Sequence, residues 1–255
     1  MNGLNEVIPL PKSQIIKDIV EDAVPLSKSL YRLYVLALDV KNTKLANWAL
    51  QELSGYSNSA DAPAYRKTQS INFTYSGLNG TFQVQNVHLS LGWIPEDMHE
   101  RLINISACQG IELIENYAKA ENSIRIDRSN LAGAVCAATD EGVNCTSIMQ
   151  HIPQSFYAGI VAEVKTKMLQ ALIALEKKYG NLDNLGIDIS NTKPNQLIAD
   201  NDSINRMVLN VNVPAQESEK ETIFSKITWN VIAPIITGVA GAIIGAALMA
   251  YLGLA

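Results

Sequence analysis

The sequence predicts an α+β protein: a mainly helical cytoplasmic domain with a small β-hairpin or sheet, plus one C-terminal transmembrane helix. Residues 13–55 carry apolar side chains at helical spacing, residues 71–87 alternate in the manner of two strands around a turn, and residues 227–255 contain no charged side chain. We therefore expect three parts. They are a helical and α+β domain over residues 1–185, a linker with a possible short strand over 186–226, and the transmembrane helix over 227–255.

Three short helices are predicted at the start of the chain. Ser13 can cap the first, the second covers about residues 26–40, and the third opens at Thr43 and stops at Gly55, a residue suited to a left-handed helix end. In each segment, apolar side chains recur three and four residues apart, as on a buried helix face. These faces comprise Ile15, Ile16, Ile19, Val20 and Val24; Leu30, Leu33, Tyr34, Ala37 and Leu38; and Leu45, Trp48, Ala49 and Leu53.

A β-hairpin is predicted next. Residues 71–75 alternate between apolar and polar side chains, residues 77–80 read Gly-Leu-Asn-Gly and signal a turn, and residues 81–87 form the second strand. We expect three apolar side chains of the hairpin to pack on a helix: Phe73, Phe82 and Val84.

Beyond the hairpin, Pro95 fits the first turn of a helix, and one or two helices are expected up to about Lys119. Residues 121–150 predict an irregular stretch with one strand near 123–128. A long helix with a continuous apolar stripe follows from Pro153 to Tyr179. The polar region after it carries one alternating run, residues 207–213, which we expect to be the strand of the linker.

The C-terminal segment has the length and composition of a membrane span. Residues 231–251 supply about 20 apolar positions, enough to cross a hydrocarbon core of about 30 Å. Lys220 and Lys226 precede this run and no Lys or Arg follows it, which predicts that residues 1–226 lie in the cytoplasm. No signal peptide is expected at the other end.

Small residues lie along one side of this predicted span. Gly241 and Gly245 form a GxxxG motif, and Gly238 and Ala242 extend it. Small side chains let helix backbones approach closely in lipid. We therefore expect the lipid bilayer and further copies of the same chain to be partners of this protein.

Composition and motifs argue against several function classes. The formal net charge of −5 disfavours a nonspecific nucleic-acid binder. The three cysteines have no CxxC spacing and the three histidines are scattered, so we expect neither a metal site nor a cofactor. Phosphate-binding GxxxxGK[ST] and GxGxxG motifs and the GxSxG nucleophile motif are missing from the sequence. A binding and effector role is thus favoured over an enzyme, and no catalytic residue is assigned.

One segment carries a family resemblance. Trp48 lies on a helix that continues into Glu52-Leu-Ser-Gly-Tyr56, and Pro63-Ala-Tyr65-Arg66 follows. This arrangement resembles the AbiTii domain of bacterial abortive-infection proteins, and the helix over 164–179 is similar to the later part of that domain. The resemblance covers roughly residues 10–185. It implies a role in defence against phage and brings no catalytic residues with it.

The same segment supports two interpretations. In the structural one, which we favour, Trp48 belongs to the core, Gly55 provides a positive φ, and Arg66 pairs with Glu52 or with a helix-end carbonyl. In the functional one, Tyr65 and Arg66 are exposed and bind a nucleotide or phosphate by stacking and ion pairing. The candidate ligand-binding residues are Glu52, Tyr65 and Arg66.

Together these features predict a membrane-anchored antiphage effector. Its cytoplasmic domain would sense a phage-derived molecule, a neighbouring gene product or a nucleotide, and its transmembrane helices would associate and disrupt the inner membrane. Two alternatives remain open. One is a membrane-tethered nuclease or nucleotide hydrolase that uses Glu52, Tyr65 and Arg66, or one of the acidic pairs Glu21-Asp22, Glu96-Asp97 and Asp140-Glu141. The other is a scaffold that recruits another toxin.

Overall fold

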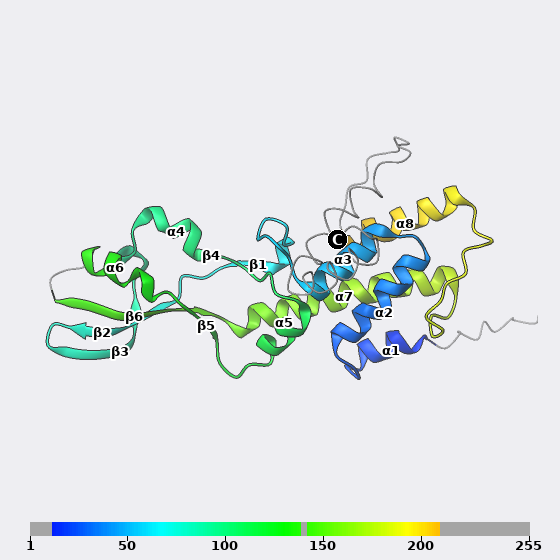
Figure 1. Ribbon diagram of the computed structural model, residues 1–255. Helices are drawn as coiled ribbons and strands as arrows, with labels where there is room; N and C mark the ends of the chain where they lie inside the picture. The colour runs from blue at the N-terminus through cyan, green and yellow to red at the C-terminus, as the bar shows by residue number, and fades with distance from the viewer. Residues whose placement is uncertain (1–11, 139–141, 210–255) are drawn as a thin grey trace, which may run out of the picture. The chain divides into compact units, whose positions relative to one another are not determined.

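The computed structural model describes residues 12–138 and 142–209 (Figure 1). The described part is an α+β domain, with a group of helices around one hydrophobic core and a small antiparallel sheet with a second core. The described residues form one compact unit. The predicted fold class is confirmed for this domain, whereas the predicted transmembrane helix lies outside the described residues.

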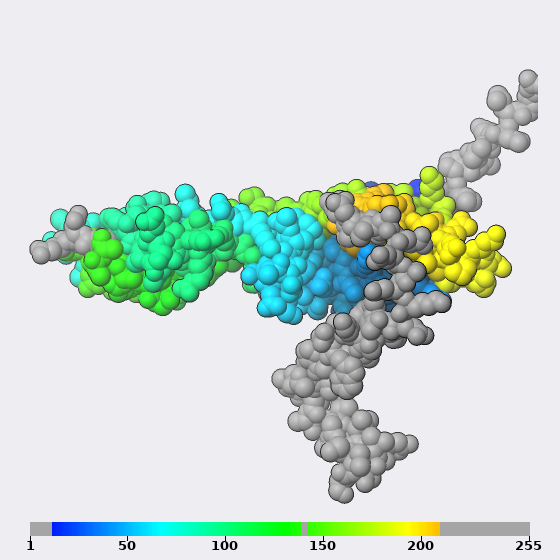
Figure 2. Space-filling model, turned by 90° about the horizontal axis from the view of Figure 1, so that it is seen from above, coloured from blue at the N-terminus to red at the C-terminus, as the bar shows by residue number. Residues whose placement is uncertain are grey.

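Within the described ranges, six helices contribute side chains to the larger core (Figure 1). The long helix α7 contacts α1, α2, α5 and α8, and α3 packs on α2, α5 and α8. The surface of α8, orange in Figure 2, adjoins the yellow-green surface of α7. The six helices are α1 (Gln14–Val20), α2 (Leu26–Asp39), α3 (Thr43–Ser54), α5 (Ile111–Ala118), α7 (Gln154–Tyr179) and α8 (Pro194–Leu209).

The first three helices were predicted correctly, but two of their ends differ in detail. Ser13 precedes α1 without capping it, because its hydroxyl donates to Glu176 Oε1 (2.7 Å) and accepts from the backbone N–H of Leu182 (2.9 Å). Asn42, rather than Thr43, caps α3 through its side chain. Val20, expected on the buried face of α1, is 60% exposed.

The four-stranded sheet has the order β3-β2-β6-β5, with every neighbouring pair antiparallel. One face of β2 packs on the second core through Phe73 and Tyr75. Two short strands, β1 (Lys67–Gln69) and β4 (Asn104–Ser106), pair separately. The strands of the larger sheet are β2 (Phe73–Asn79), β3 (Phe82–Leu89), β5 (Ile124–Asp127) and β6 (Val143–Ile152).

The hairpin prediction is correct in outline and wrong in two details. Gly77 and Leu78 belong to strand β2, where the register shifts, so the turn is shorter than expected. Phe82 is 75% exposed at the turn end of β3 and is not among the side chains that pack on the second core, whereas Val84, two residues further along the strand, packs against that core.

The elements that cover the second core are helices α4 (Glu96–Ile103) and α6 (Ala132–Ala138). The helix expected after Pro95 and the strand expected near residues 123–128 are both present. Strand β6, the longest in the sheet, was not predicted, since its stretch was expected to be irregular.

Helix α8 occupies the region where the sequence predicted a linker. The start of the expected strand, residues 207–209, is the last turn of α8, and Ile204 and Val208 are buried against the larger core. None of the helices in the described ranges is long and apolar enough to span a membrane. The apolar run 227–255 lies outside those ranges.

Candidate functional site

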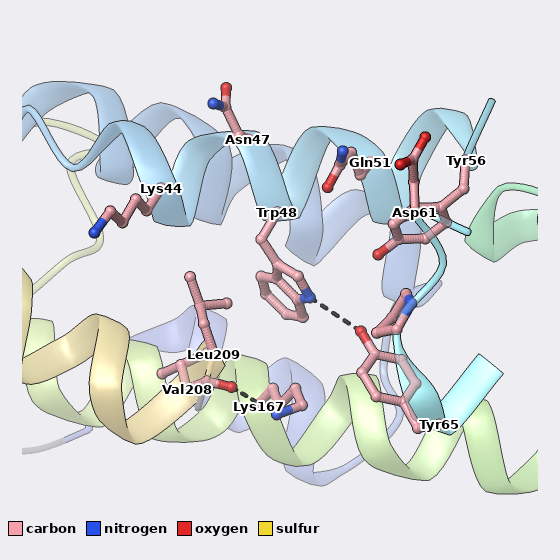
Figure 3. Close-up of a pocket in the computed structure, with 11 residues that line it drawn as sticks. Lys44, Asn47, Trp48, Gln51, Tyr56, Asp61, Tyr65, Lys167, Val208 and Leu209 are labelled. Carbon is pink, nitrogen blue, oxygen red and sulfur yellow. Dashed lines mark hydrogen bonds between the residues drawn. The ribbon is translucent and has the colours of Figure 1, made fainter. Parts of the chain in front are cut away.

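A pocket of about 460 Å³ opens between α3, α7 and α8 (Figure 3). We call it the α3–α8 pocket. Helix α3 presents Lys44, Asn47, Trp48 and Gln51 to it, because positions three and four residues apart share a helix face. Its volume lies within the range of roughly 300–1,000 Å³ that is typical of small-molecule sites.

The other walls come from distant parts of the chain. Figure 3 shows Tyr65 below the end of α3, Lys167 on α7, and Val208 and Leu209 at the end of α8. Tyr56 and Asp61 lie beside the C-terminal end of α3. The pocket therefore combines aromatic rings, two lysines, side-chain amides and one carboxylate.

Beneath the aromatic wall lies a buried carboxylate, Glu52, that accepts four hydrogen bonds. Its Oε1 accepts from the hydroxyls of Tyr56 (2.5 Å) and Tyr65 (2.7 Å). Its Oε2 accepts from Nε (3.2 Å) and Nη2 (2.6 Å) of Arg66. A buried charge is costly unless it is paired and hydrogen-bonded, and Glu52 meets both conditions.

Arg66 connects this carboxylate to the segment that precedes α5. Its Nη1 donates to the carbonyl oxygens of Ala107 (2.8 Å) and Gln109 (2.7 Å). Its guanidinium also lies over the ring of Tyr56, 5.1 Å from the ring centroid. The Glu52–Arg66 pair thus holds α3, the 3₁₀ turn η1 (Ala64–Arg66) and residues 107–109 together.

Two glycines permit this close approach of backbones. Gly55 has φ of 90°, and a Cβ there would lie 2.4 Å from the carbonyl oxygen of Cys108. A Cβ on Gly110 would lie 2.3 Å from the carbonyl oxygen of Leu53. The positive φ expected at Gly55 is confirmed, although its ψ of 178° is not that of a left-handed helix end, and glycine is required there for steric as well as conformational reasons.

The surroundings of Glu52 change the acidity of its tyrosine partners. Burial raises the pKa of Tyr56 above its ordinary value of 10.0, and the negative charge of Glu52 raises it further. The pKa of Tyr65 is raised for the same two reasons in the same order. Both phenols therefore remain protonated hydrogen-bond donors at neutral pH.

Trp48 and Tyr65 extend the hydrogen-bond chain from Glu52 to the pocket. The indole Nε1 of Trp48 donates to the hydroxyl of Tyr65 over 3.0 Å, and that hydroxyl donates to Glu52 (Figure 3). Trp48 is 8% exposed, in agreement with its predicted place in the core. The rings that line the pocket are consequently fixed in position by a buried network.

The three candidate ligand-binding residues, Glu52, Tyr65 and Arg66, lie side by side, but they differ in their surroundings. Glu52 and Arg66 are fully buried, so the pairing expected in the structural interpretation is present, and direct contact of Arg66 with a ligand would require the pair to open. Tyr65 lines the pocket. Ligand binding by these residues stays a prediction.

Sequence reasoning missed Lys167. This residue lies among the buried positions of α7, three residues after Val164 and one before Met168, and it is only 7% exposed. A lysine inside an apolar helix stripe was the available signal, because lysine is rarely buried without a partner. Its ammonium donates to the carbonyl oxygen of Val208 over 2.6 Å.

In the described ranges, no group of three His, Cys, Asp or Glu side chains lies close enough together to bind a metal ion. The residues assigned to transmembrane association, Gly238, Gly241, Ala242 and Gly245, fall outside those ranges.

The fold and the pocket define an α+β domain with a single long central helix and an aromatic, basic pocket beside a buried ion pair. The family model named AbiTii matches residues 13–200, and the chain belongs to this family. Membership indicates a role in abortive infection, the defence of bacteria against phage. Neither the curated proteins nor the solved structures contain a match.

Proposed function

We propose that this protein is a membrane-anchored effector of abortive infection in the bacterial inner membrane. Its AbiTii domain detects an infection signal in the cytoplasm, and its C-terminal segments then associate and disrupt the membrane. One observation carries the proposal: an AbiTii domain is joined in one chain to a charge-free run, residues 227–255, that is rich in glycine and alanine.

The α3–α8 pocket supports the sensing half of this proposal. It is preformed, it is lined by rings held in place by hydrogen bonds, and its wall includes the end of α8. From Leu209 the chain continues toward the proposed membrane segment. A signal bound in this pocket therefore acts on the part of the domain nearest in sequence to the effector segment.

The association half is tested with Gly241→Leu combined with Gly245→Leu. In a helix of 3.6 residues per turn, these positions share one face, and Leu would prevent close approach of two copies. Ala240→Leu combined with Ala247→Leu adds bulk on the opposite face and is the matched control. We expect the glycine variant to insert in the membrane but to lose protection against phage, and the alanine variant to retain it.

Equal protection by both variants would contradict helix association. Replacing residues 227–255 with an unrelated membrane helix distinguishes the effector function from the two remaining alternatives. Full protection after that replacement would indicate a tethered enzyme, such as a nuclease or nucleotide hydrolase, or a scaffold that recruits another toxin.

A further inference from the structure

Lys167 connects the α3–α8 pocket to the end of helix α8. It lines the pocket, and its ammonium holds the carbonyl oxygen of Val208, the residue before the last of α8. The last four carbonyls of a helix have no partner inside the helix, and a cation at this end also interacts favourably with the helix dipole. Lys167 therefore stabilises the last turn of α8.

The ammonium of Lys167 has capacity for a further partner. It carries three N–H donors, and in the described ranges its one hydrogen bond goes to Val208. It also forms a long ion pair with Glu163 Oε1 (3.5 Å), whose side chain is partly exposed on the same helix, and it lies 5.7 Å from the ring centroid of Tyr65. An anion in the pocket would meet a desolvated cation whose donors are not all engaged.

The rest of the pocket has the chemistry of a nucleotide site. The rings of Trp48 and Tyr65 offer apolar, π-bearing surface to a planar base. The amides of Asn47 and Gln51 can both donate and accept hydrogen bonds, and the carboxylate of Asp61 can accept from ribose hydroxyls or base amino groups. A bare phosphate ion would use the lysines and leave these other groups without a partner.

We propose that the α3–α8 pocket binds a nucleotide, whose phosphate contacts Lys167 and whose base packs against Trp48 and Tyr65, and that binding weakens the bond between Lys167 and Val208. The phosphate binds the donors that Val208 leaves unused, and because a charge-assisted contact to phosphate is stronger than one to a neutral carbonyl, it draws the ammonium into the pocket and lengthens its bond to Val208. Occupancy thus loosens the last turn of α8. This regulatory step rests on the proposed function, whereas binding itself does not.

The binding experiment uses the full chain purified in detergent micelles. Calorimetric titration is carried out with ATP, GTP, CTP and UTP, and with inorganic triphosphate and adenosine as the two partial ligands. We expect at least one nucleotide to bind, and to bind more tightly than either partial ligand. Absence of binding by all four at millimolar concentration, or equal binding of inorganic triphosphate, would overturn the assignment.

Variants locate the site. Lys167→Met removes the charge and keeps the length of the side chain, and we expect at least about tenfold weaker binding. Lys177→Met, on an exposed part of α7, is the matched control and should bind as the natural chain does. Asn47→Trp fills the pocket from an exposed position and should abolish binding even if Lys167→Met fails to fold. Unchanged affinity of Asn47→Trp would place the nucleotide elsewhere.

Hydrogen exchange measures the coupling to α8. Nucleotide should accelerate amide exchange in residues 205–209, and folded Lys167→Met should show fast exchange there without nucleotide. Binding with no change in exchange would overturn the coupling. The two proposals can fail separately. If the chain binds no nucleotide but infected cells depolarise, only the nucleotide site is overturned. If the chain binds nucleotide but infected cells do not depolarise, only the effector function is overturned.

Discussion

Glu52 and Arg66 form an ion pair from which water is excluded: Arg66 Nη2 lies 2.6 Å from Glu52 Oε2, and neither side chain has exposed surface. The pair joins a helix to a segment more than 40 residues later in the chain, through the bonds of Arg66 to Ala107 and Gln109. Removing one partner would leave the other as an uncompensated buried charge.

We expect Arg66→Met to lower the free energy of unfolding by about 3–5 kcal/mol. Chemical denaturation monitored by circular dichroism measures this. The double variant Glu52→Leu with Arg66→Met should lose less than the sum of the two single variants, because no charge is then left unpaired. A loss below about 1 kcal/mol for Arg66→Met would show that the pair behaves like an exposed one.

Gly110→Ala should be strongly destabilising. The added Cβ would lie 2.3 Å from the carbonyl oxygen of Leu53, so the backbones that Arg66 holds together must separate. Gly133→Ala in α6 is the matched control: its Cβ meets no atom within 4 Å, and alanine favours a helix over glycine by about 1 kcal/mol. Thermal unfolding of both variants tests this, and equal melting temperatures would contradict the close approach.

Alkaline titration tests the buried tyrosines. The folded state raises the pKa of Tyr56 and Tyr65 by burial and by the charge of Glu52, so it favours their protonated form. This preference contributes fully to the free energy of unfolding below pH 10.0, the ordinary pKa of tyrosine. Its contribution decreases as pH rises above that value. Phenolate absorbance, compared between the natural chain and Tyr56→Phe with Tyr65→Phe, isolates the two groups. We expect their ionisation to coincide with loss of the circular dichroism signal, and ionisation while that signal remains native would contradict the network.

Acid conditions test Glu176, which joins the start of α1 to α7. Burial of its carboxyl acts to raise the pKa, but hydrogen bonds from Lys12 and Ser13 outweigh it and lower the pKa below 4.5. The stabilisation is therefore present above pH 4.5 and is lost as pH falls through the lowered value. Glu176→Gln should cost about 1–3 kcal/mol at neutral pH and progressively less in acid. A cost independent of pH would contradict this assignment, and Glu121→Gln, in an exposed loop, is the control.

The sequence predicted the helices whose apolar pattern and end signals lie within the helix itself or directly beside it. Helices α2, α3 and α7 combine continuous apolar periodicity with clear end signals, such as Gly55 and Gly180, and the structure places them as expected. The pairing of Glu52 with Arg66 was also predictable, because a glutamate that shares a helix face with a core tryptophan requires a charged partner, and the structure gives Arg66 that role.

The missed elements depend on distant partners. Strand β6 alternates poorly in sequence and is stabilised by β2, some 70 positions earlier in the chain, so its pairing leaves little local pattern. Helix α8 is polar along most of its length and is held through Ile204 and Val208, which pack on the larger core. Lys167 lies inside an apolar stripe, and its hydrogen-bond partner, the carbonyl oxygen of Val208, belongs to α8, a helix that the sequence did not predict.

We have proposed that the AbiTii domain controls a C-terminal segment that disrupts the membrane. The most direct test is the membrane potential of bacteria challenged with phage while they express the full chain or a version that ends at Lys226. We expect depolarisation after challenge in cells with the full chain and a normal potential in cells with the shortened one. Growth arrest of cells with the full chain while their membrane potential stays normal would contradict it.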